Sequence, residues 1–290
     1  MKIGPDTTAL VTGGDSGIGF GIAQALIETG ARVIIAGLSD AALTAAAERL
    51  GGRIETTVLD IRDRDAWAAL AEKLWADGEG VDLLVNNAGV GYLTPALETS
   101  FEQWDWLIDI DLTGGFNGVR SLVPRMLESG RPGRIVATAS IGGLLAAPGS
   151  VYAAAKAGVI GFMEALQTEL WDTEVGVSIL VPGIVRSNIA NGLRPPGDTR
   201  AIQPGGADMD ALYQQPMEPL EVGRRVVRAV ENDELYVITH AEHGPMLERR
   251  FDAIRRSVPD ESAPEARAAV ERMVLDHPIY DARRRDEDGA

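Results

Sequence analysis

A tyrosine and a lysine stand four residues apart in the stretch VYAAAKAG, as Tyr152 and Lys156, with only alanines between them. Residues at this spacing share one face of a helix, so the ammonium can lie beside the phenol. A fixed cation favours the phenolate, which makes tyrosine usable as a proton donor or acceptor near neutral pH. A chance pair is the alternative, although Lys156 is one of only three lysines in the chain. The pattern indicates acid–base chemistry.

A glycine-rich segment, TGGDSGIG at residues 12–19, follows a run of strand-forming residues and precedes a helical pattern. Backbone N–H groups at such a turn can bind a pyrophosphate, because glycines allow close approach and the helix dipole favours an anion. Gly13, Gly17 and Gly19 are spaced G-x-x-x-G-x-G, which differs from the general dinucleotide fingerprint. A plain glycine-rich turn is the alternative, but the position between the first strand and the first helix favours nucleotide binding.

Short apolar runs alternate with longer segments of helical periodicity along most of the chain. Because the runs are continuously apolar, we expect strands covered on both faces by helices such as 17–29, 40–50 and 63–76. We therefore predict an α/β fold with a doubly wound, seven-stranded parallel sheet, Rossmann-like, that binds ligands at the carboxyl ends of its strands. The predicted strands are 7–12, 32–37, 54–59, 81–87, 133–140, 177–183 and 235–239.

Residues 191–218 interrupt this alternation with a segment rich in proline, glycine and aspartate. A loop of this length beside the ligand edge is typical of a substrate lid. Beyond the last strand, 243–257 and 262–275 have the pattern of two amphipathic helices. We expect one dinucleotide-binding and catalytic domain over 1–257 and a C-terminal extension over 258–290, helical and then frayed.

The formal net charge of −16 argues against nucleic acid and anionic membrane surfaces as partners. The chain has no cysteine, no run long enough to span a membrane and no leader-like start, so we predict a cytoplasmic protein. His240 and His243 lie three residues apart, but the only other histidine is His277 in the C-terminal extension. We therefore expect no metal site and assign the two histidines to the surface or to an interface.

The chain resembles the short-chain dehydrogenase/reductase family over about residues 1–240, because six motifs of that family occur in order. They are the turn at 12–19, Asp60 after the third strand, N-N-A-G at 86–89, Ser140 after the fifth strand, the Tyr152 and Lys156 pair, and P-G followed by a serine at Pro182, Gly183 and Ser187. The resemblance implies a hydride transfer between substrate carbon and a nicotinamide. Tyr152 would exchange a proton with the substrate oxygen, Ser140 would orient that oxygen, and Lys156 would hold the nicotinamide ribose while favouring the phenolate.

The resemblance also implies a set of residues that bind NAD(P) along the carboxyl edge of the sheet. On the sequence alone Asp60 could equally cap a helix, the asparagines could make a turn, and Ser187 could face solvent. The expected cofactor-binding residues are Gly13, Asp15, Ser16, Gly17, Ile18, Gly19, Gly37, Leu38, Ser39, Asp60, Ile61, Asn87, Ala88, Gly89, Tyr152, Lys156, Pro182, Gly183, Val185 and Ser187.

Two positions depart from the family pattern. Asp111 stands where the family usually has an asparagine that completes a proton path to the lysine. We assign Asp111 to the catalytic set as an isostere that keeps the hydrogen bonds and adds a negative charge near Lys156. Gly37 stands where NAD-selective relatives have an acid, and neither Leu38 nor Ser16 supplies the basic group of NADP-selective relatives. Ser39 could receive the 2′-phosphate of NADP, whereas Asp15 and Asp40 would oppose it. We therefore expect weak discrimination between NAD and NADP, with a slight preference for NADP.

The residues around the expected site are apolar, which suits a bulky apolar or aromatic alcohol or ketone better than a sugar. They are Tyr92, Leu144, Leu145, Ala146, Ile184, Val185, Ile189, Leu193, Tyr213 and Met217. The segments 19–32, 187–189 and 235–251 resemble the subset of the family that oxidises the benzylic alcohol of lignin-derived aryl ethers. The alternative is a nucleotide-sensing regulator or scaffold with the same fold and no turnover. The resemblance further implies a homodimer or homotetramer built on helices at about 101–128 and 150–172.

Overall fold

The computed structural model of the chain describes residues 1–76, 80–146, 149–187, 193–195, 198 and 215–281. These residues contain the predicted seven-stranded parallel sheet, and each observed strand overlaps its predicted range. The strands are β1 (Thr8–Thr12), β2 (Arg32–Gly37), β3 (Ile54–Val58), β4 (Leu83–Asn86), β5 (Gly133–Thr138), β6 (Val175–Val181) and β7 (Tyr236–Ile238).

The strands are ordered β3-β2-β1-β4-β5-β6-β7 across the sheet. β1 therefore pairs with β2 on one side and β4 on the other, in parallel register with Leu10 opposite Ile34 and Leu84. The direction of the connections reverses between β1 and β4, and such a switch point is where open parallel sheets bind ligands. The segments that follow β1 and β4 are therefore where a ligand site is expected.

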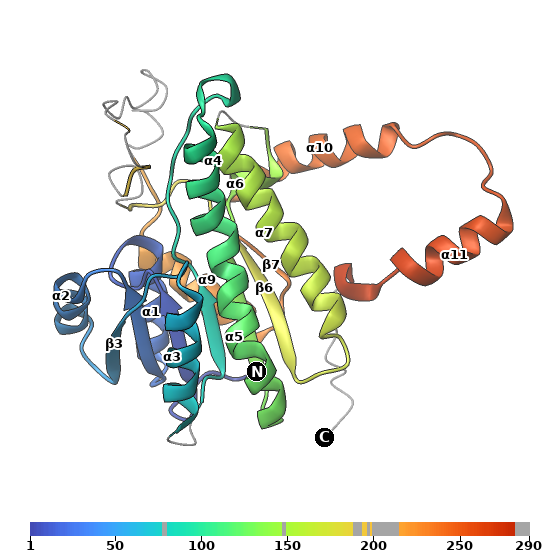
Figure 1. Cartoon of the computed structure of the whole chain (residues 1–290). Helices are drawn as coiled ribbons and strands as arrows, with labels where there is room; N and C mark the ends of the chain where they lie inside the picture. Colours follow the sequence, from blue (N-terminus) through green and yellow to red (C-terminus); the bar gives the residue numbers. More distant parts are fainter. Residues whose placement is uncertain (77–79, 147–148, 188–192, 196–197, 199–214, 282–290) are drawn as a thin grey trace.

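Helices cover both faces of the sheet (Figure 1), as its continuously apolar strands require. One layer contains α1 (Gly17–Glu28), α2 (Asp40–Leu50) and α9 (Pro219–Glu231). The other contains α3 (Arg64–Ala76), α4 (Phe101–Ile108), α5 (Gly114–Ser129) and α7 (Ser150–Glu169). α4 and α5 are joined by η2 (Asp109–Thr113), a π-helical turn.

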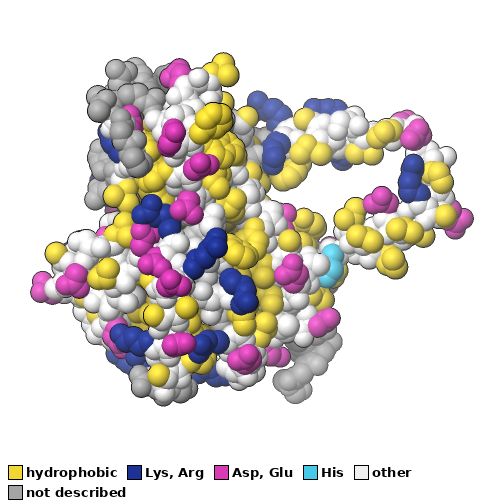
Figure 2. Space-filling view, viewed as in Figure 1, with side chains coloured by type: hydrophobic (Ala, Val, Ile, Leu, Met, Phe, Trp, Pro, Cys, Tyr) yellow, Lys and Arg dark blue, Asp and Glu magenta, His cyan; other side chains and the backbone are white. Residues whose placement is uncertain are grey.

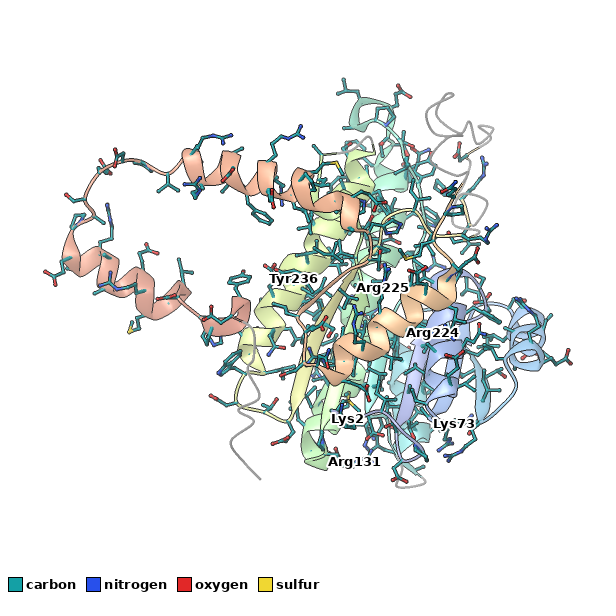
Figure 3. The ribbon with its side chains drawn as sticks, turned by 180° about the vertical axis from the view of Figure 1, so that it is seen from behind. Lys2, Lys73, Arg131, Arg224, Arg225 and Tyr236 are labelled. Carbon is teal, nitrogen blue, oxygen red and sulfur yellow. The ribbon has the colours of Figure 1, made fainter. Side chains whose placement is uncertain are left out.

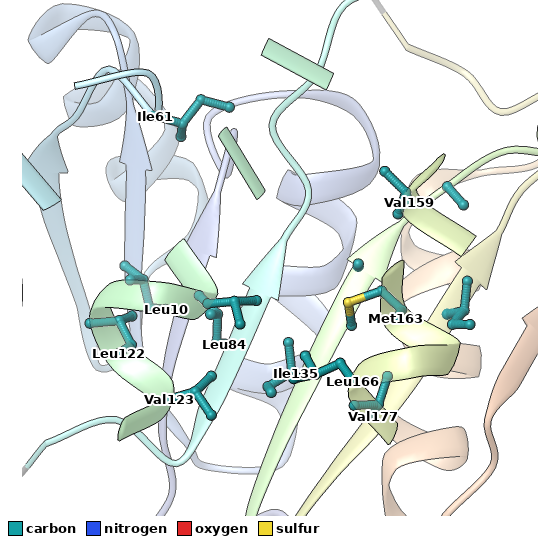
Figure 4. Close-up of a cluster of buried hydrophobic side chains, with 14 of the residues drawn as sticks. Leu10, Ile61, Leu84, Leu122, Val123, Ile135, Val159, Met163, Leu166 and Val177 are labelled. Atoms are coloured by element: carbon teal, nitrogen blue, oxygen red, sulfur yellow. The ribbon is translucent and has the colours of Figure 1, made fainter. Parts of the chain in front are cut away.

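Alternate residues of each strand enter separate cores on the two faces. Leu10, Leu84 and Ile135 face the α5 and α7 layer, where they meet Leu122 and Met163 (Figure 4). All five are almost completely buried. Full burial of one such side chain stabilises the fold by about 1.5–3 kcal/mol, so the α7 helix that carries the tyrosine and the lysine is fixed firmly on the sheet.

α1 and α9 approach each other closely at Gly21 and Gly223. A Cβ added at Gly223 would lie 2.2 Å from the carbonyl oxygen of Gly21, so only glycine allows this approach. An exposed ion pair of 3.1 Å between Arg224 and Glu28 lies beside the crossing, and Arg225 donates to the carbonyl of Thr239 at the end of β7 (Figure 3). The crossing ties the glycine-rich turn that opens α1 to the end of the sheet.

The C-terminal extension contains the two expected helices, α10 (Gly244–Arg256) and α11 (Glu265–Leu275), followed by η5 (Pro278–Tyr280). Short helices also occur at η1 (Ala96–Glu98), α6 (Ile141–Leu144) and η4 (Ala241–His243).

Most of the predicted lid, 191–218, lies outside the described residues. Near the end of the lid, Met217 forms a parallel β-bridge with Val185. Among the described helices, none has both the length and the apolar character needed to cross a bilayer.

Gly223→Ala is expected to destabilise the protein by about 1–3 kcal/mol, because the new methyl group would force α1 and α9 apart. The matched control is Gly161→Ala in the middle of α7, where nothing lies within 4 Å of the added Cβ. That control should stabilise the protein by about 0.5–1 kcal/mol through helix propensity. Urea unfolding of both variants checks the prediction, and equal midpoints would refute the close helix crossing.

Candidate active site

The predicted catalytic residues converge at the carboxyl ends of β4 and β5. Tyr152 and Lys156 lie on the first two turns of α7, and the Lys156 Nζ is 5.6 Å from the centre of the Tyr152 ring. Tyr152 is half-buried, whereas Lys156 is only 4% exposed. The spacing of four residues therefore places a buried cation against a phenol that keeps an open side.

Ser140 follows β5 and caps α6, where its Oγ accepts a hydrogen bond of 3.1 Å from the N–H of Gly142. A Cβ built on Gly142 would lie 3.6 Å from that Oγ and 3.7 Å from Cε1 of Tyr152. Ser140 and Tyr152 thus flank the same glycine, and Gly142 leaves the space between them open. This arrangement suits a substrate oxygen held between a hydroxyl and a phenol.

Lys156 forms a buried ion pair with Asp111, whose side chain is wholly inaccessible to solvent. Nζ lies 3.2 Å from Oδ2 of Asp111 and donates a 3.3 Å hydrogen bond to the carbonyl of Thr138. The other carboxylate oxygen, Oδ1, accepts a 2.7 Å hydrogen bond from the N–H of Val90. Gly89 leaves room for this pair, because a Cβ there would lie 3.1 Å from Oδ1 of Asp111 and 3.2 Å from Nζ, closer than an ordinary van der Waals contact.

Burial and mutual attraction together shift the pKa values of Lys156 and Asp111. Burial opposes the ammonium, but Asp111 and then Tyr152 outweigh it, so the pKa of Lys156 lies above its ordinary value. Burial also raises the pKa of Asp111, and the nearby ammonium and the Val90 N–H act against that rise. Lys156 is therefore held protonated, and Asp111 is the group on which its charge depends.

A hydrogen-bond network around Asn87 joins the segment after β4 to the glycine-rich turn. Its Nδ2 donates to the carbonyl of Thr12 at 3.0 Å, and its Oδ1 accepts from Thr138 Oγ1 at 3.1 Å. The hydroxyl of Thr12 accepts the N–H groups of Asn87 and Ala88 at 2.9 and 3.0 Å. Asn87 therefore uses its amide to fix the ends of β1, β4 and β5 relative to one another.

The turn at 12–19 is shaped by its glycines. Gly13 and Gly17 adopt left-handed backbone conformations, with φ of 62° and 51°. A Cβ at Gly19 would lie 2.1 Å from the carbonyl oxygen of Gly13, and one at Gly17 would lie 3.0 Å from the Cβ of Ser187. The turn consequently packs tightly on itself, opens directly into α1, and has Ser187 beside it. Ser16 and Ile18 lie in the same turn, with Ser16 exposed at the N-cap of α1.

The end of β2 carries the residues expected to meet the adenosine ribose. Leu38 is exposed, and Ser39 caps α2 by accepting the N–H of Ala42. Asp15 approaches this point from the glycine-rich turn, since its Oδ1 lies 2.9 Å from the position of a Cβ on Gly37. Asp15 therefore brings a carboxylate to the end of β2, beside Gly37.

Asp60 and Ile61 follow β3 but are engaged by this chain's own residues. Arg62 forms a two-pronged ion pair with Asp60, with Nη2 2.6 Å from Oδ2, and this hydrogen bonding lowers the pKa of Asp60. The side chain of Ile61 is buried against the backbone of Gly114. Any contact of Asp60 with an adenine would compete with Arg62.

The segment after β6 is held by a histidine to which sequence reasoning gave no role in the site. The Nδ1 of His240 accepts the N–H of Gly183 at 3.2 Å, and its Nε2 lies 3.2 Å from the carbonyl of Ile184, to which it donates. His243 stacks on His240 with ring centres 5.3 Å apart and is buried, and this burial lowers its pKa. Of the two expected places, surface or interface, the surface is wrong for His243, which is buried by contacts distant in sequence.

The predicted apolar wall is only partly in place within the described residues. Tyr92, Leu144 and Leu145 are half-buried, and the Tyr92 ring meets Trp106 edge-on at 6.3 Å. Val185 instead packs in the core against α1 and α9, so only its backbone can face a ligand. Pro182 is likewise buried. Ile189 and Tyr213 lie outside the described residues.

No cluster of three or more potential metal ligands occurs in the part of the chain that the structure describes.

Comparisons with known proteins find similar dehydrogenases. Residues 7–197 match the family model described as short chain dehydrogenase. The chain is 38% identical over 287 residues to the C alpha-dehydrogenase of a Sphingobium species, and the alignment covers 94% of each protein.

Two solved structures are similar over most of the chain. One is a short chain dehydrogenase/reductase from Burkholderia phymatum in complex with NAD, with a TM-score of 0.81 and 27% identity over 91% of this chain and 99% of that one. The other is the apo form of LigD from a Sphingobium species, with a TM-score of 0.74 and 34% identity over 88% and 99%.

Asp111→Asn is expected to leave the protein folded and active, because the amide oxygen can still accept the Val90 N–H. Without the carboxylate, burial lowers the pKa of Lys156, so the ammonium is lost at a lower pH. The alkaline limb of the kcat/KM profile should therefore move to lower pH. Asp111→Leu is the contrasting variant, and it should cost about 3–5 kcal/mol of stability because it leaves a buried charge unpaired. An unchanged profile in the asparagine variant would contradict this account of the pair.

Proposed function

Since the chain belongs to the short-chain dehydrogenase/reductase family, we propose that it interconverts a bulky apolar or aromatic secondary alcohol and its ketone, using NAD(P). The observation that carries the proposal is the placement of Ser140 and Tyr152 on either side of Gly142, with Lys156 behind the phenol. A hydroxyl, a phenol and a buried ammonium at the carboxyl edge supply what proton transfer to and from an alcohol oxygen needs.

The carboxyl edge has features that fit a nicotinamide dinucleotide. The glycine-rich turn leaves backbone N–H groups unscreened by side chains at the start of α1, which suits a pyrophosphate. Ser187 lies beside that turn, and Lys156 and Tyr152 lie at the other end of the edge, where a ribose and nicotinamide would be held. The bound cofactor supplies the hydride acceptor for alcohol oxidation and the donor for ketone reduction.

The chain's own residues handle the proton. In the oxidative direction, Tyr152 Oη accepts the alcohol proton while the Ser140 hydroxyl hydrogen-bonds to the substrate oxygen and fixes its position. Lys156 places a positive charge beside the phenol, and Asp111, 3.2 Å away, keeps Lys156 charged. Thr138 and Val90 contribute a carbonyl and an N–H that hold this pair in place. In reduction the same proton returns from Tyr152 to the oxygen.

The substrate class is inferred from two observations. Half-buried apolar residues, Tyr92, Leu144 and Leu145, lie near the carboxyl edge, and the described wall adds no basic side chain that would favour a carboxylate substrate. The C alpha-dehydrogenase relative aligns over nearly the whole chain. A benzylic alcohol of an aryl ether is the substrate type that we propose to test first.

A nucleotide-sensing protein without turnover is the competing function. Such a protein needs the glycine-rich turn but has no use for Ser140 and Tyr152 in their relative positions.

We also propose a homo-oligomer, with an interface on helices α4, α5 and α7. The exposed side chains of Phe101, Trp104 and Phe116 on α4 and α5 support this interface.

Tyr152→Phe should lower kcat by a hundredfold or more on any good substrate, because the proton donor and acceptor is lost. Cofactor affinity should change little. Activity is followed by nicotinamide absorbance with panels of aryl, steroid and aliphatic secondary alcohols, of which the aryl panel should give the highest kcat/KM. A phenylalanine variant as active as the parent would exclude this mechanism, whereas nucleotide binding without turnover on every panel would favour the competing function.

Cofactor choice is proposed to be weak, with a slight preference for NADP. The wild-type ratio of kcat/KM for the two cofactors should stay within about a hundredfold, equal to about 2.7 kcal/mol. Asp15→Asn should raise the NADP preference by about tenfold, because it removes a charge that opposes a 2′-phosphate near Gly37. Asp172→Asn, at the opposite edge of the sheet, is the control and should not change the ratio of kcat/KM for the two cofactors. An Asp15→Asn ratio equal to that of the control would show that Asp15 does not face the ribose.

A further inference from the structure

The C-terminal helices stand away from the body of the molecule (Figures 1 and 3). We call residues 248–276, which include most of α10 and all of α11, the arm. Every residue of the arm except Ala268 is exposed. The helices of the arm are short, and helices of this length are marginal in water unless a face is packed. Among the residues that the structure describes, the arm therefore lacks the packing contacts that would stabilise it.

Both helices of the arm carry an apolar stripe. In α10 and just beyond it, Leu247, Phe251, Ile254 and Val258 follow each other at intervals of four, three and four residues, which places them on one side of the helix. Leu247 is buried against the body, whereas Phe251 and Ile254 are each 52% exposed and Val258 is 65% exposed. The stripe thus begins in the core and continues into solvent.

The second helix repeats the pattern with Val270, Met273 and Val274, and Leu275 follows them. These four side chains are 57–80% exposed. Figure 2 shows apolar side chains gathered along both helices of the arm. Such a set of exposed large apolar side chains marks an interaction surface.

The arm is fixed to its own body at both ends. At the near end Leu247 and His243 are buried. At the far end Ile279 is buried, the His277 ring meets Trp171 at 4.8 Å, and Tyr280 Oη donates to Glu164 of α7 at 3.3 Å. The anchors set the position of the stripes, so the surface that they present is defined before any partner arrives.

We propose that the occupant of this surface is a second copy of this chain, held by a reciprocal exchange of arms. The length of the arm falls within the roughly 20–30 residues that each side of a standard interface contributes. A two-fold arrangement buries two arms at once, and closed two-fold assemblies are the commonest among soluble proteins.

Charge supports the same occupant. On a helix of 3.6 residues per turn, Arg250 and Arg255 flank the Phe251 and Ile254 stripe on its two sides. Interfaces commonly have such an apolar centre and a polar rim enriched in arginine. The chain has 43 acidic and 27 basic residues, so the surface of a second copy is rich in carboxylates that Arg250 can meet. Arg255 already pairs with Asp252 of its own helix at 3.0 Å.

The test uses the full chain at micromolar concentration in analytical ultracentrifugation. Phe251→Gln with Ile254→Gln removes the centre of the stripe. The matched control is Glu248→Gln with Arg249→Gln, which introduces the same residues on α10 outside the stripe and keeps the net charge. The wild type and the control should sediment as a multiple of 30.8 kDa. The stripe variant should form a smaller species or dissociate at a concentration at least about a hundredfold higher.

Hydrogen exchange provides a second measurement. The arm should be protected in the wild type at high concentration and exchange fast in the stripe variant, while the melting temperature of the body stays the same. A stripe variant that sediments like the control would overturn the inference and leave the proposed interface on α4, α5 and α7 standing. A monomeric wild type with an unprotected arm would overturn both. A protected arm in a wild-type monomer would show that the arm folds onto its own body, and would also overturn the inference.

Discussion

The buried ion pair between Lys156 and Asp111 is the interaction on which the candidate site depends. Taking two charges out of water costs several kcal/mol per ion, which is recovered only when geometry and hydrogen bonds are good. Here the pair is 3.2 Å long, and the N–H of Val90 and the carbonyl of Thr138 complete it. The pair and its two hydrogen bonds hold four segments together: the π-helical turn η2, the end of β5, the helix α7 and the segment after β4 that carries Val90. It also sets the charge beside Tyr152, so structure and chemistry depend on the same contact.

The surrounding elements are arranged to keep that contact possible. Gly89 leaves room for both charged groups, and Asn87 ties the segment after β4 to the ends of β1 and β5. His240 does the same for the segment after β6 by binding the backbone at Gly183 and Ile184. The sheet supplies the rigid base, since α7 rests on side chains that are almost completely buried. The site is therefore assembled from loops whose backbones are held by specific polar contacts.

Local signals in the sequence predicted the parts of the fold that depend on neighbouring residues. Runs of apolar and β-branched residues predicted all seven strands, and the spacing of Tyr152 and Lys156 placed them on one helix face. Local signals could not predict contacts between distant segments. His240 binds the backbone of Gly183, fifty-seven residues away, and the Val185 side chain packs in the core rather than toward a ligand. Arg62 engages Asp60 although the family pattern assigned Asp60 to the adenine. The C-terminal helices were predicted from their amphipathic pattern, but a pattern does not say that the apolar side faces away from its own chain.

We propose that the side chains around Gly142 serve a direct hydride transfer from a secondary alcohol. A deuterium atom placed on the carbinol carbon of an aryl secondary alcohol tests this most directly during oxidation by the wild-type protein. The deuterium should be recovered on the reduced nicotinamide ring, with a slower rate than for the unlabelled alcohol when chemistry limits turnover. Recovery of the label in water, or binding of the cofactor with no transfer from any alcohol tested, would contradict it.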